Sequence, residues 1–341
     1  MEKGPEIRIV GGASVEKKEQ TRKEVEQALF SHFESLSPQE REQFEKFEYP
    51  KSEKELALIG FANEETSRLM QEAGIEPYDV PVENFHIIPP ELYKKAAGDN
   101  GTATTFNAKQ GIIFDAQYFR DNPVNFGAVA LHESLHLKAH FSMEVQEEGD
   151  KVKKTPYREG VTTRALQSHG HHGKYHQHFE GLHEGIVAET EKRLLGKLLD
   201  RPELAKEKGW LMSGEAKEMR KKLAEKKEIP EDDIVWVGKK GENDWETVSY
   251  LRQRDVLNYV CTEIQKQFPD EYQSADDVYK TFLNAHFTGR LLPLARIVEK
   301  TFGEGGFRLL GNMDTDRQSG VLHLESLKKA RVRQTREKTI T

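Results

Sequence analysis

The sequence contains a single cysteine, Cys261, among its 341 residues. One thiol cannot form an internal disulfide, so we expect stability to depend on packing and hydrogen bonds, and a reducing compartment is the simplest setting. Residues 1–20 lack the apolar stretch of a secretory signal. No apolar run approaches the ~18 residues that a membrane helix needs. These absences predict a cytoplasmic protein without a membrane partner.

An excess of basic charge is also missing. The chain has 51 lysine and arginine residues against 58 aspartate and glutamate residues, which gives a formal net charge of −7. A general nucleic-acid-binding surface needs clustered positive charge, so no nucleic-acid partner is expected. Hydrophobic residues make up 36% of the chain and charged residues 32%. This balance favours a globular body that carries long, solvated helices.

Hydrophobic periodicity predicts a mostly helical α+β protein. Segment 82–89 alternates and predicts a strand, and segment 102–115 has two β-type runs around an Asn-Ala-Lys-Gln-Gly turn, which predicts a hairpin. A helix is expected to begin after Asn122-Pro123. The polar segment 143–156 predicts a loop, and 245–268 predicts a helix. The expected architecture is a small, mainly antiparallel sheet with an edge strand beside the helix after Pro123, followed by a helical subdomain.

Composition divides the chain into a core and charged extensions. The expected parts are charged, partly disordered accessory helices at 1–50, a core domain at 51–315 with a charged helical insertion at 200–244, and a basic C-terminal tail at 316–341. Six basic residues lie between Lys328 and Lys338 against one acid, Glu337. A solvated tail is the favoured interpretation, and contact with an acidic partner is the alternative.

The segment 127–142, GAVALHESLHLKAHFS, contains His132, Glu133 and His136 in an HExxH arrangement. On a helix, positions i and i+4 share one face, so the two imidazoles can converge on one cation at Zn–N distances of about 2.0–2.1 Å. Glu133 lies beside that face and can reach a zinc-bound water, whose pKa the ion lowers to roughly 7. The motif therefore predicts a zinc site with Glu133 as general base.

The competing interpretation is a packed helix whose histidines are ordinary core residues. The apolar flanks AVAL and SLHL predict that this helix is buried. Burying two uncoordinated histidines beside a carboxylate would cost several kcal/mol. The context therefore favours metal binding over simple packing.

Two glutamates are candidates for the third zinc ligand. A catalytic zinc ion keeps three protein ligands and one open position. The metzincin spacing requires a histidine at position 142, where the chain has Ser142, and His140 stands at the wrong spacing. Glu184 lies in a strongly amphipathic predicted helix, 178–199, whereas Glu159 lies in a weaker structural setting. Glu184 is favoured, and Glu159 remains the alternative.

Two glycines support the choice of Glu184. Gly181 and Gly185 flank it, and we expect them to let this helix approach the motif helix closely. The combination of HExxH with a later xEGxxxE helix resembles the gluzincin metallopeptidases, in particular small, minigluzincin-like bacterial and archaeal members. The resemblance covers roughly residues 80–312.

The resemblance implies a zinc centre in which His132, His136 and Glu184 hold one Zn²⁺ ion and Glu133 is the general base. The chain departs from the larger gluzincins at two positions. His183 stands where they have asparagine before the glutamate, and Ala188 stands where an orienting aspartate would lie.

The remaining histidines are concentrated in segment 169–183, HGHHGKYHQHFEGLH. A polar loop that lines the cleft is the favoured interpretation, and a second metal site is the alternative. A tetrahedral oxyanion needs a hydrogen-bond donor, and the sequence does not choose among its candidates. These candidates are His183, Tyr157, Tyr250 and His286.

The leading hypothesis is a zinc-dependent metallopeptidase that acts on a peptide or protein substrate. The substrate would pair with an edge strand from the 102–115 hairpin, and Glu133 would move the proton from water to the leaving amine. A non-catalytic scaffold or regulatory protein that retains a structural zinc is the main alternative. Hydrolysis of a non-peptide amide is a third, because HExxH specifies the attacking water and not the substrate.

Overall fold

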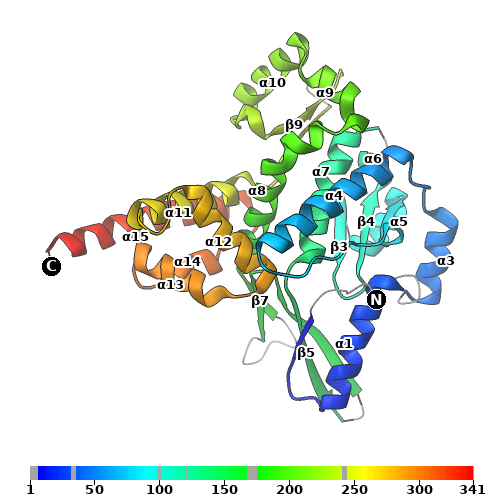
Figure 1. The fold of residues 1–341 in the computed structure, drawn as a ribbon, viewed down its shortest axis with the longest axis horizontal. Coiled ribbons are helices and arrows are strands. Elements are labelled where there is room, and N and C mark those ends of the chain that lie inside the picture. Colours follow the sequence, from blue (N-terminus) through cyan, green and yellow to red (C-terminus); the bar gives the residue numbers. More distant parts are fainter. Residues whose placement is uncertain are drawn as a thin grey trace.

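The computed structural model describes residues 7–31, 36–98, 101–119, 121–149, 151–166, 175–239 and 244–340. The fold is α+β and mostly helical, as the sequence predicts, with the helices grouped around small sheets (Figure 1). The helices are α1 (Val15–Phe30), α3 (Pro38–Phe47), α4 (Glu53–Glu72), α5 (Pro90–Ala97), α6 (Ala116–Phe119), α7 (Pro123–Lys138), α8 (Glu180–Leu199), α9 (Ala205–Leu211), α10 (Gly214–Lys227), α11 (Leu251–Gln267), α12 (Ala275–Thr288), α13 (Leu291–Phe302), α14 (Gly306–Gly311) and α15 (Arg317–Ile340).

Within the described ranges, the strands form three separate sheets. They are β1 (Ile7–Val10), β2 (Phe85–Ile88), β3 (Ala103–Phe106), β4 (Gly111–Asp115), β5 (Phe141–Glu148), β6 (Lys151–Glu159), β7 (Thr162–Leu166), β8 (Tyr175–His178), β9 (Ile234–Val237) and β10 (Trp245–Thr247). The larger sheet has the order β1-β5-β6-β7-β8, the second has the order β2-β4-β3, and β9 pairs with β10. The second sheet contains the hairpin expected over 102–115, with Phe106 opposite Gly111. Strand β3 lies at the edge of this sheet.

Helix α7 carries the HExxH motif and lies in the main hydrophobic core. The side chain of Asn122 accepts a hydrogen bond from the N–H of Asn125, and Pro123 occupies the first helical turn, where its missing N–H costs no hydrogen bond. Helices α4 and α8 both pack against α7. At Gly127, a Cβ would lie 2.8 Å from Leu198 Cδ1 of α8, so the glycine permits this close approach. The motif is therefore held by packing over most of its length.

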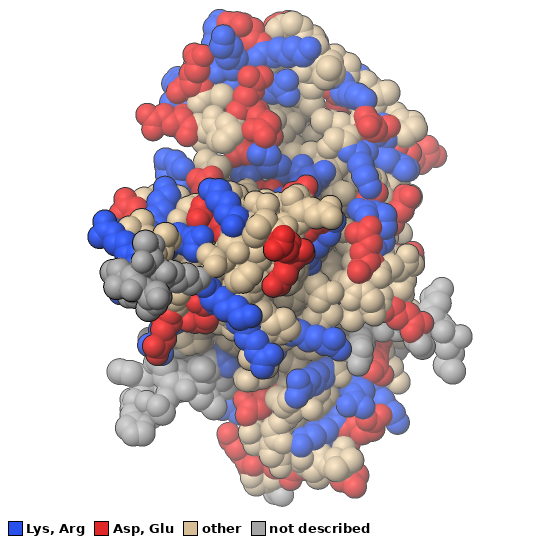
Figure 2. Space-filling view, turned by 60° about the vertical axis from the view of Figure 1, so that its left-hand side comes forward, with Lys and Arg blue, Asp and Glu red and all other residues tan. Residues whose placement is uncertain are grey.

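Some of the helices after α8 extend away from the two main sheets. Helices α9 and α10 stand with β9 at the top of Figure 1, and α15 projects to the side. Figure 2 shows lysine and arginine side chains interspersed with aspartate and glutamate over the visible face. Within the described ranges, no helix combines the length and apolar character required to cross a bilayer.

Several segments differ from the sequence-based predictions. Residues 143–156 are not a loop, because they fall within the antiparallel β5–β6 hairpin. Residues 245–247 form strand β10, and helix α11 begins only at Leu251. In the N-terminal part, Ile7–Val10 is a strand that pairs parallel with β5. The basic C-terminal segment is helical as α15.

Candidate metal centre

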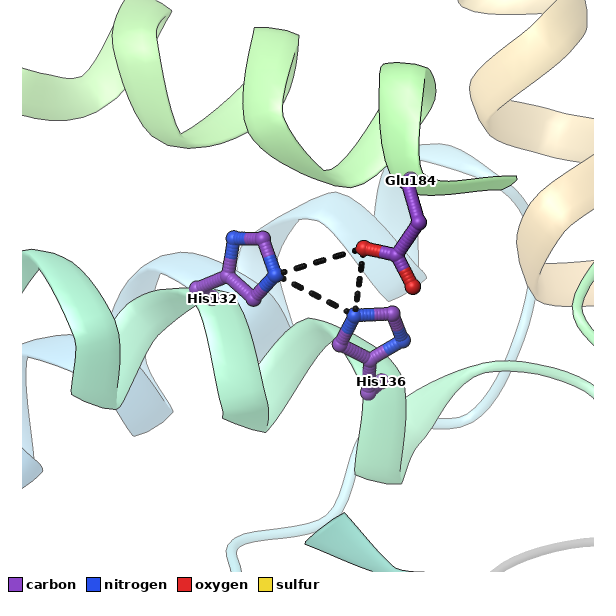
Figure 3. A group of neighbouring side chains, drawn as sticks. All are labelled: His132, His136 and Glu184. Atoms are coloured by element: carbon purple, nitrogen blue, oxygen red, sulfur yellow. Dashed lines mark hydrogen bonds and ion pairs between the residues drawn. The ribbon is translucent and has the colours of Figure 1, made fainter. Parts of the chain in front are cut away.

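Three side chains from two helices converge at the motif. His132 and His136 lie one turn apart on α7, and Glu184 reaches them from the first half of α8 (Figure 3). The two Nε2 atoms are 3.2 Å apart. Glu184 Oε2 lies 3.6 Å from His132 Nε2 and 3.4 Å from His136 Nε2. The three ligand atoms therefore form a nearly regular triangle.

The size of this triangle fits one zinc ion. Ligands about 2.0–2.1 Å from a tetrahedral zinc lie about 3.3–3.4 Å from one another. The observed separations of 3.2, 3.4 and 3.6 Å bracket this value. Glu184 Oε2 is also buried without a hydrogen-bond partner among the described residues, which a bound cation would satisfy. The three side chains remain 10–16% exposed, so the site is not sealed from solvent.

The charges at the site are strongly coupled. Burial lowers the pKa of His132 and His136, but the neighbouring carboxylates together outweigh it. Glu184 and Glu191 raise the pKa of His132, Glu184 raises that of His136, and Glu133 adds to both. Burial would raise the pKa of Glu184, yet the two rings hold it well below its usual range. A metal must displace the ring protons in order to bind, so we expect its affinity to fall with decreasing pH.

Glu191 orients the first histidine. Its Oε2 lies 2.9 Å from His132 Nδ1, the ring nitrogen that faces away from the ligand triangle. A carboxylate in this position fixes the imidazole tautomer and raises its basicity as a ligand. Glu191 is seven residues beyond Glu184, two turns along the same helix face, whereas the expected orienting position is occupied by Ala188. Sequence reasoning missed this residue, because the i+7 spacing places Glu191 on the same helix face as Glu184 but does not show that this face meets His132.

His183 supports the second histidine rather than the glutamate that follows it. His183 Nε2 lies 2.8 Å from His136 Nδ1, and the two rings are stacked with centroids 4.8 Å apart. Burial and the neighbouring histidines lower the pKa of His183 well below its usual range, which keeps the ring neutral. The Nε2 atom of a neutral His183 ring can accept a hydrogen bond from an N–H at His136 Nδ1.

Glu159, the alternative ligand, lies near His136 and His183, and these three residues form a second group with metal-ligand chemistry. The 2.8 Å separation of His136 Nδ1 and His183 Nε2 is a hydrogen-bond distance and is shorter than the spacing of two zinc ligands. Burial also raises the pKa of Glu159. The geometry therefore favours Glu184 as the third ligand.

Glu133 is held beside the triangle by the edge strand. The Thr105 hydroxyl of β3 lies 2.7 Å from Glu133 Oε2 and 3.1 Å from its backbone carbonyl oxygen. These contacts hold the Glu133 carboxylate in position. They also bring the outer strand of the second sheet next to the motif helix.

The expected oxyanion donors differ in their positions. The ring of Tyr250 stacks on His132 with centroids 6.2 Å apart, and burial together with the carboxylates of Glu184 and Glu133 raises its pKa. Tyr250 also has a positive φ of 55° at the start of α11. Residues other than glycine rarely adopt this backbone conformation, and it often marks functional sites. Tyr157 is exposed, and His286 Nε2 lies 3.1 Å from the carbonyl oxygen of Leu135. Of these three residues, Tyr250 is therefore the one whose ring packs against a member of the ligand triangle, His132.

The flanking glycines and the histidine-rich segment differ in part from the sequence-based predictions. Gly181 and Gly185 do permit close approaches, but to Met313–Asp314 and to Gln253 of α11, not to the motif helix. His169, His171 and His172 lie outside the described residues, as does the side chain of His176. Residues 175–178 form strand β8 and not the favoured polar loop, and the alternative of a second metal site among the histidines of 169–183 stays a prediction.

Comparison with known proteins adds no functional assignment. No protein-family model, no curated protein and no solved structure matches the chain. The resemblance to gluzincins consequently remains a prediction, and any functional conclusion must be argued from the geometry of the site.

Proposed function

We propose that the chain is a zinc-dependent metallopeptidase. The observation that supports this is the triangle of His132, His136 and Glu184 with spacings of 3.2–3.6 Å, next to the carboxylate of Glu133. A zinc ion held there would supply Lewis acidity, which polarises a scissile carbonyl and lowers the pKa of a water to about 7. Glu191 and His183 would keep the two histidines in the tautomer that binds metal.

The remaining steps belong to residues of the chain. Glu133 would accept a proton from the attacking water and return it to the leaving amine. Thr105 would hold Glu133 in position through the 2.7 Å hydrogen bond. A peptide would add to the free edge of β3 as an extended strand, and the Tyr250 hydroxyl would donate to the developing oxyanion. Because Cys261 is buried and alone, we propose the cytoplasm as the place of action.

The first test separates binding from catalysis. Glu133→Gln should retain stoichiometric zinc and lose peptide hydrolysis, because an amide has no basic oxygen to take the proton. Zinc content is measured on purified protein, and hydrolysis is measured on an unbiased peptide library. Wild-type cleavage by the variant would contradict the role of Glu133.

The second test concerns the third ligand. Glu184→Ala should lose zinc, whereas Glu159→Ala should retain it, because only Glu184 Oε2 lies within 3.6 Å of both Nε2 atoms. Glu159→Ala also removes a carboxylate that lies close to His136, which makes it a suitable control. Loss of zinc from Glu159→Ala alone would show that the metal lies in the other group.

The scaffold alternative requires a closed site with four protein ligands. The groups with metal-ligand geometry in the described part of the chain contain three residues each. X-ray absorption of the zinc-loaded protein distinguishes the two functions. Three protein ligands and one water support the peptidase, and four protein ligands support the structural zinc.

A further inference from the structure

The chain between α8 and α11 leaves the metal centre and returns to it. It continues from α8, the helix that carries Glu184, through α9, α10, β9 and β10, and reaches Tyr250 immediately before α11 (Figure 1). Strand β9 packs against the motif helix α7. The ring of Tyr250 stacks on that of His132, with centroids 6.2 Å apart. The charged insertion is therefore connected at one end to a zinc-ligand helix and at the other to the proposed oxyanion donor.

The backbone of Tyr250 is held in an unfavourable conformation. Its φ of 55° and ψ of 39° are left-handed, where the Cβ atom crowds the following carbonyl oxygen. Such a conformation persists only where the surrounding structure holds it. Rotation about these two angles turns the peptide plane that contains the Ser249 carbonyl against the plane that contains the Tyr250 carbonyl. Contacts that hold both oxygens therefore determine where the Tyr250 side chain points.

Arg254 holds both carbonyl oxygens. Its backbone N–H donates to the carbonyl oxygen of Tyr250 at 3.0 Å, which is the ordinary first hydrogen bond of a helix. Its side-chain Nε donates to the carbonyl oxygen of Ser249 at 3.1 Å, which is an additional bond. A single residue of α11 thus fixes the two peptide planes on either side of the Tyr250 Cα atom.

Asp233, from the insertion, holds Arg254 in turn. The guanidinium donates to both carboxylate oxygens, at 3.1 Å to Oδ1 and 2.7 Å to Oδ2, and both side chains are 2% exposed. A bidentate pair of this kind fixes the plane of the guanidinium as well as its position. The backbone carbonyl oxygen of Asp233 also accepts the N–H of Val248 at 2.9 Å. Asp233 therefore secures the arginine and the chain two residues before Tyr250.

The same aspartate is tied to the helix of the third zinc ligand. Lys192 of α8, eight residues beyond Glu184, has its Nζ 2.7 Å from Asp233 Oδ1. Helices α8 and α11 also meet closely beside Glu184, because a Cβ on Gly185 would lie 3.2 Å from the carbonyl carbon and oxygen of Gln253. The segment that presents Tyr250 is therefore fixed relative to the metal centre.

We propose that the ion pair between Asp233 and Arg254 positions Tyr250 for oxyanion stabilisation by holding its backbone in the left-handed conformation. The inference rests on the proposed metallopeptidase function and deepens it, because it gives the charged insertion a part in the same reaction. Asp233 and Arg254 are positioning residues, since they act through Tyr250. An ion pair that only stabilised the fold would have no specific connection to the Tyr250 hydroxyl.

The substitution Arg254→Lys tests the positioning role. Lysine keeps the positive charge but lacks the planar fork that contacts Asp233 and Ser249 together. Lys192 still pairs with Asp233, so the carboxylate is not left alone. A misplacement of about 1 Å can cost about 100-fold in rate, so kcat should fall by about 10- to 100-fold. KM and zinc affinity should be unchanged, because an oxyanion donor acts in the transition state and not on the substrate or the metal.

A double-mutant cycle connects this loss to Tyr250. Tyr250→Phe removes the hydroxyl and keeps the ring, and it should lower kcat by about 100- to 1000-fold. Arg254→Lys should lower kcat no further in the Tyr250→Phe background, because the group that it positions is gone. A purely structural effect would lower kcat by the same factor in both backgrounds. Arg252→Lys, on the same helix but paired with Asp255 at 2.9 Å, is the matched control and should keep the wild-type kcat.

The assays use the full-length, zinc-loaded chain and the best substrate from a peptide-library digest. Zinc affinity is measured by competition with a chelator. Circular dichroism identifies a variant that fails to fold, and Asp233→Asn, which keeps the side-chain volume and one acceptor oxygen, then replaces Arg254→Lys in the same cycle with the same expected result.

Failure of the inference is distinguishable from failure of the proposed function. If the wild-type chain cleaves no peptide, the proposed function is wrong and the inference falls with it. If the wild type cleaves peptides but Arg254→Lys keeps the wild-type kcat, or loses the same factor with and without the Tyr250 hydroxyl, the inference is wrong and the peptidase stands. An unchanged kcat in Tyr250→Phe would also overturn the inference.

Discussion

The substitution Gly160→Ala tests how closely the β6–β7 turn is fitted to the histidines behind the metal centre. Gly160 has a φ of 55°, which an alanine adopts only with strain. The added Cβ would lie 2.4 Å from His183 Cε1 and 2.5 Å from its Nδ1. Carbon atoms in good contact are about 3.5–4.0 Å apart, so the ring must move by about 1 Å.

The movement has consequences for both stability and metal binding. A displacement of about 1 Å would stretch the 2.8 Å bond between His136 Nδ1 and His183 Nε2 beyond hydrogen-bonding range. Overpacking costs about 1–3 kcal/mol and the left-handed conformation about 1–2 kcal/mol, so Gly160→Ala should lower the free energy of unfolding by about 2–5 kcal/mol. Loss of the bond to a metal ligand should weaken zinc binding by about 10- to 100-fold.

Gly149→Ala is the matched control for this experiment. Gly149 also has a positive φ, 62°, but among the described residues, its chain neighbours aside, no atom lies within 4 Å of its Cβ position. Only the backbone strain of about 1–2 kcal/mol should appear, with unchanged zinc binding. Urea unfolding of the metal-free proteins gives the first quantity, and competition with a chelator gives the second. Equal destabilisation of the two variants, with wild-type zinc affinity in both, would refute the reasoning.

Three further predictions follow from contacts around the site. Glu191→Gln should weaken zinc binding by about 10- to 100-fold in a chelator titration, whereas Glu189→Gln, on the same helix but paired with Arg193, should leave it unchanged. Thr105→Val should retain zinc and reduce peptide hydrolysis by about 10- to 100-fold, because a hydrogen bond to a charged group contributes about 1.5–3 kcal/mol; an unchanged rate would exclude the positioning role. Burial, followed by nearby arginines, lowers the pKa of His140 to about 4, so the folded state binds its proton less readily than the unfolded state. The contribution of this ring to the free energy of unfolding should be complete above pH 6.5. It should fall by about 1–2 kcal/mol as the pH drops towards 4, after allowance for the partial exposure of the ring. In urea titrations at several pH values, His140→Gln should show a smaller fall than the wild type.

The parts of the site that depend on local spacing could be predicted from the sequence. Two histidines four residues apart in an apolar run specify a shared helix face, and the amphipathic pattern around Glu184 specifies a second helix. The fold class follows from the same periodicities. Alternation in 82–89 and 102–115 likewise gives strands where the structure has β2, β3 and β4.

The residues behind the ligands could not be predicted in the same way. Whether Glu191 reaches His132 depends on how α7 and α8 cross, and no spacing within one helix encodes that angle. The packing of His183 against His286 also requires α12 and the Gly160 turn, which come from distant parts of the chain. The β5–β6 hairpin was missed for a different reason. Its alternating apolar residues are Phe141, Met143 and Val145, and the polar and charged residues around them give the segment the composition of a loop.

The parallel pairing of β1 with β5 also determines when the protein can finish folding. Ile7 lies opposite Phe141, and nearby Gly12 donates a hydrogen bond to Gln146, 134 positions along the chain. At synthesis rates of about 5–20 residues per second, the first strand waits on the order of ten seconds on the ribosome before its partner exists. The helix that carries His132 and His136 of the proposed metal centre emerges in the same period, so the N-terminal strand and this helix should reach their native arrangement together.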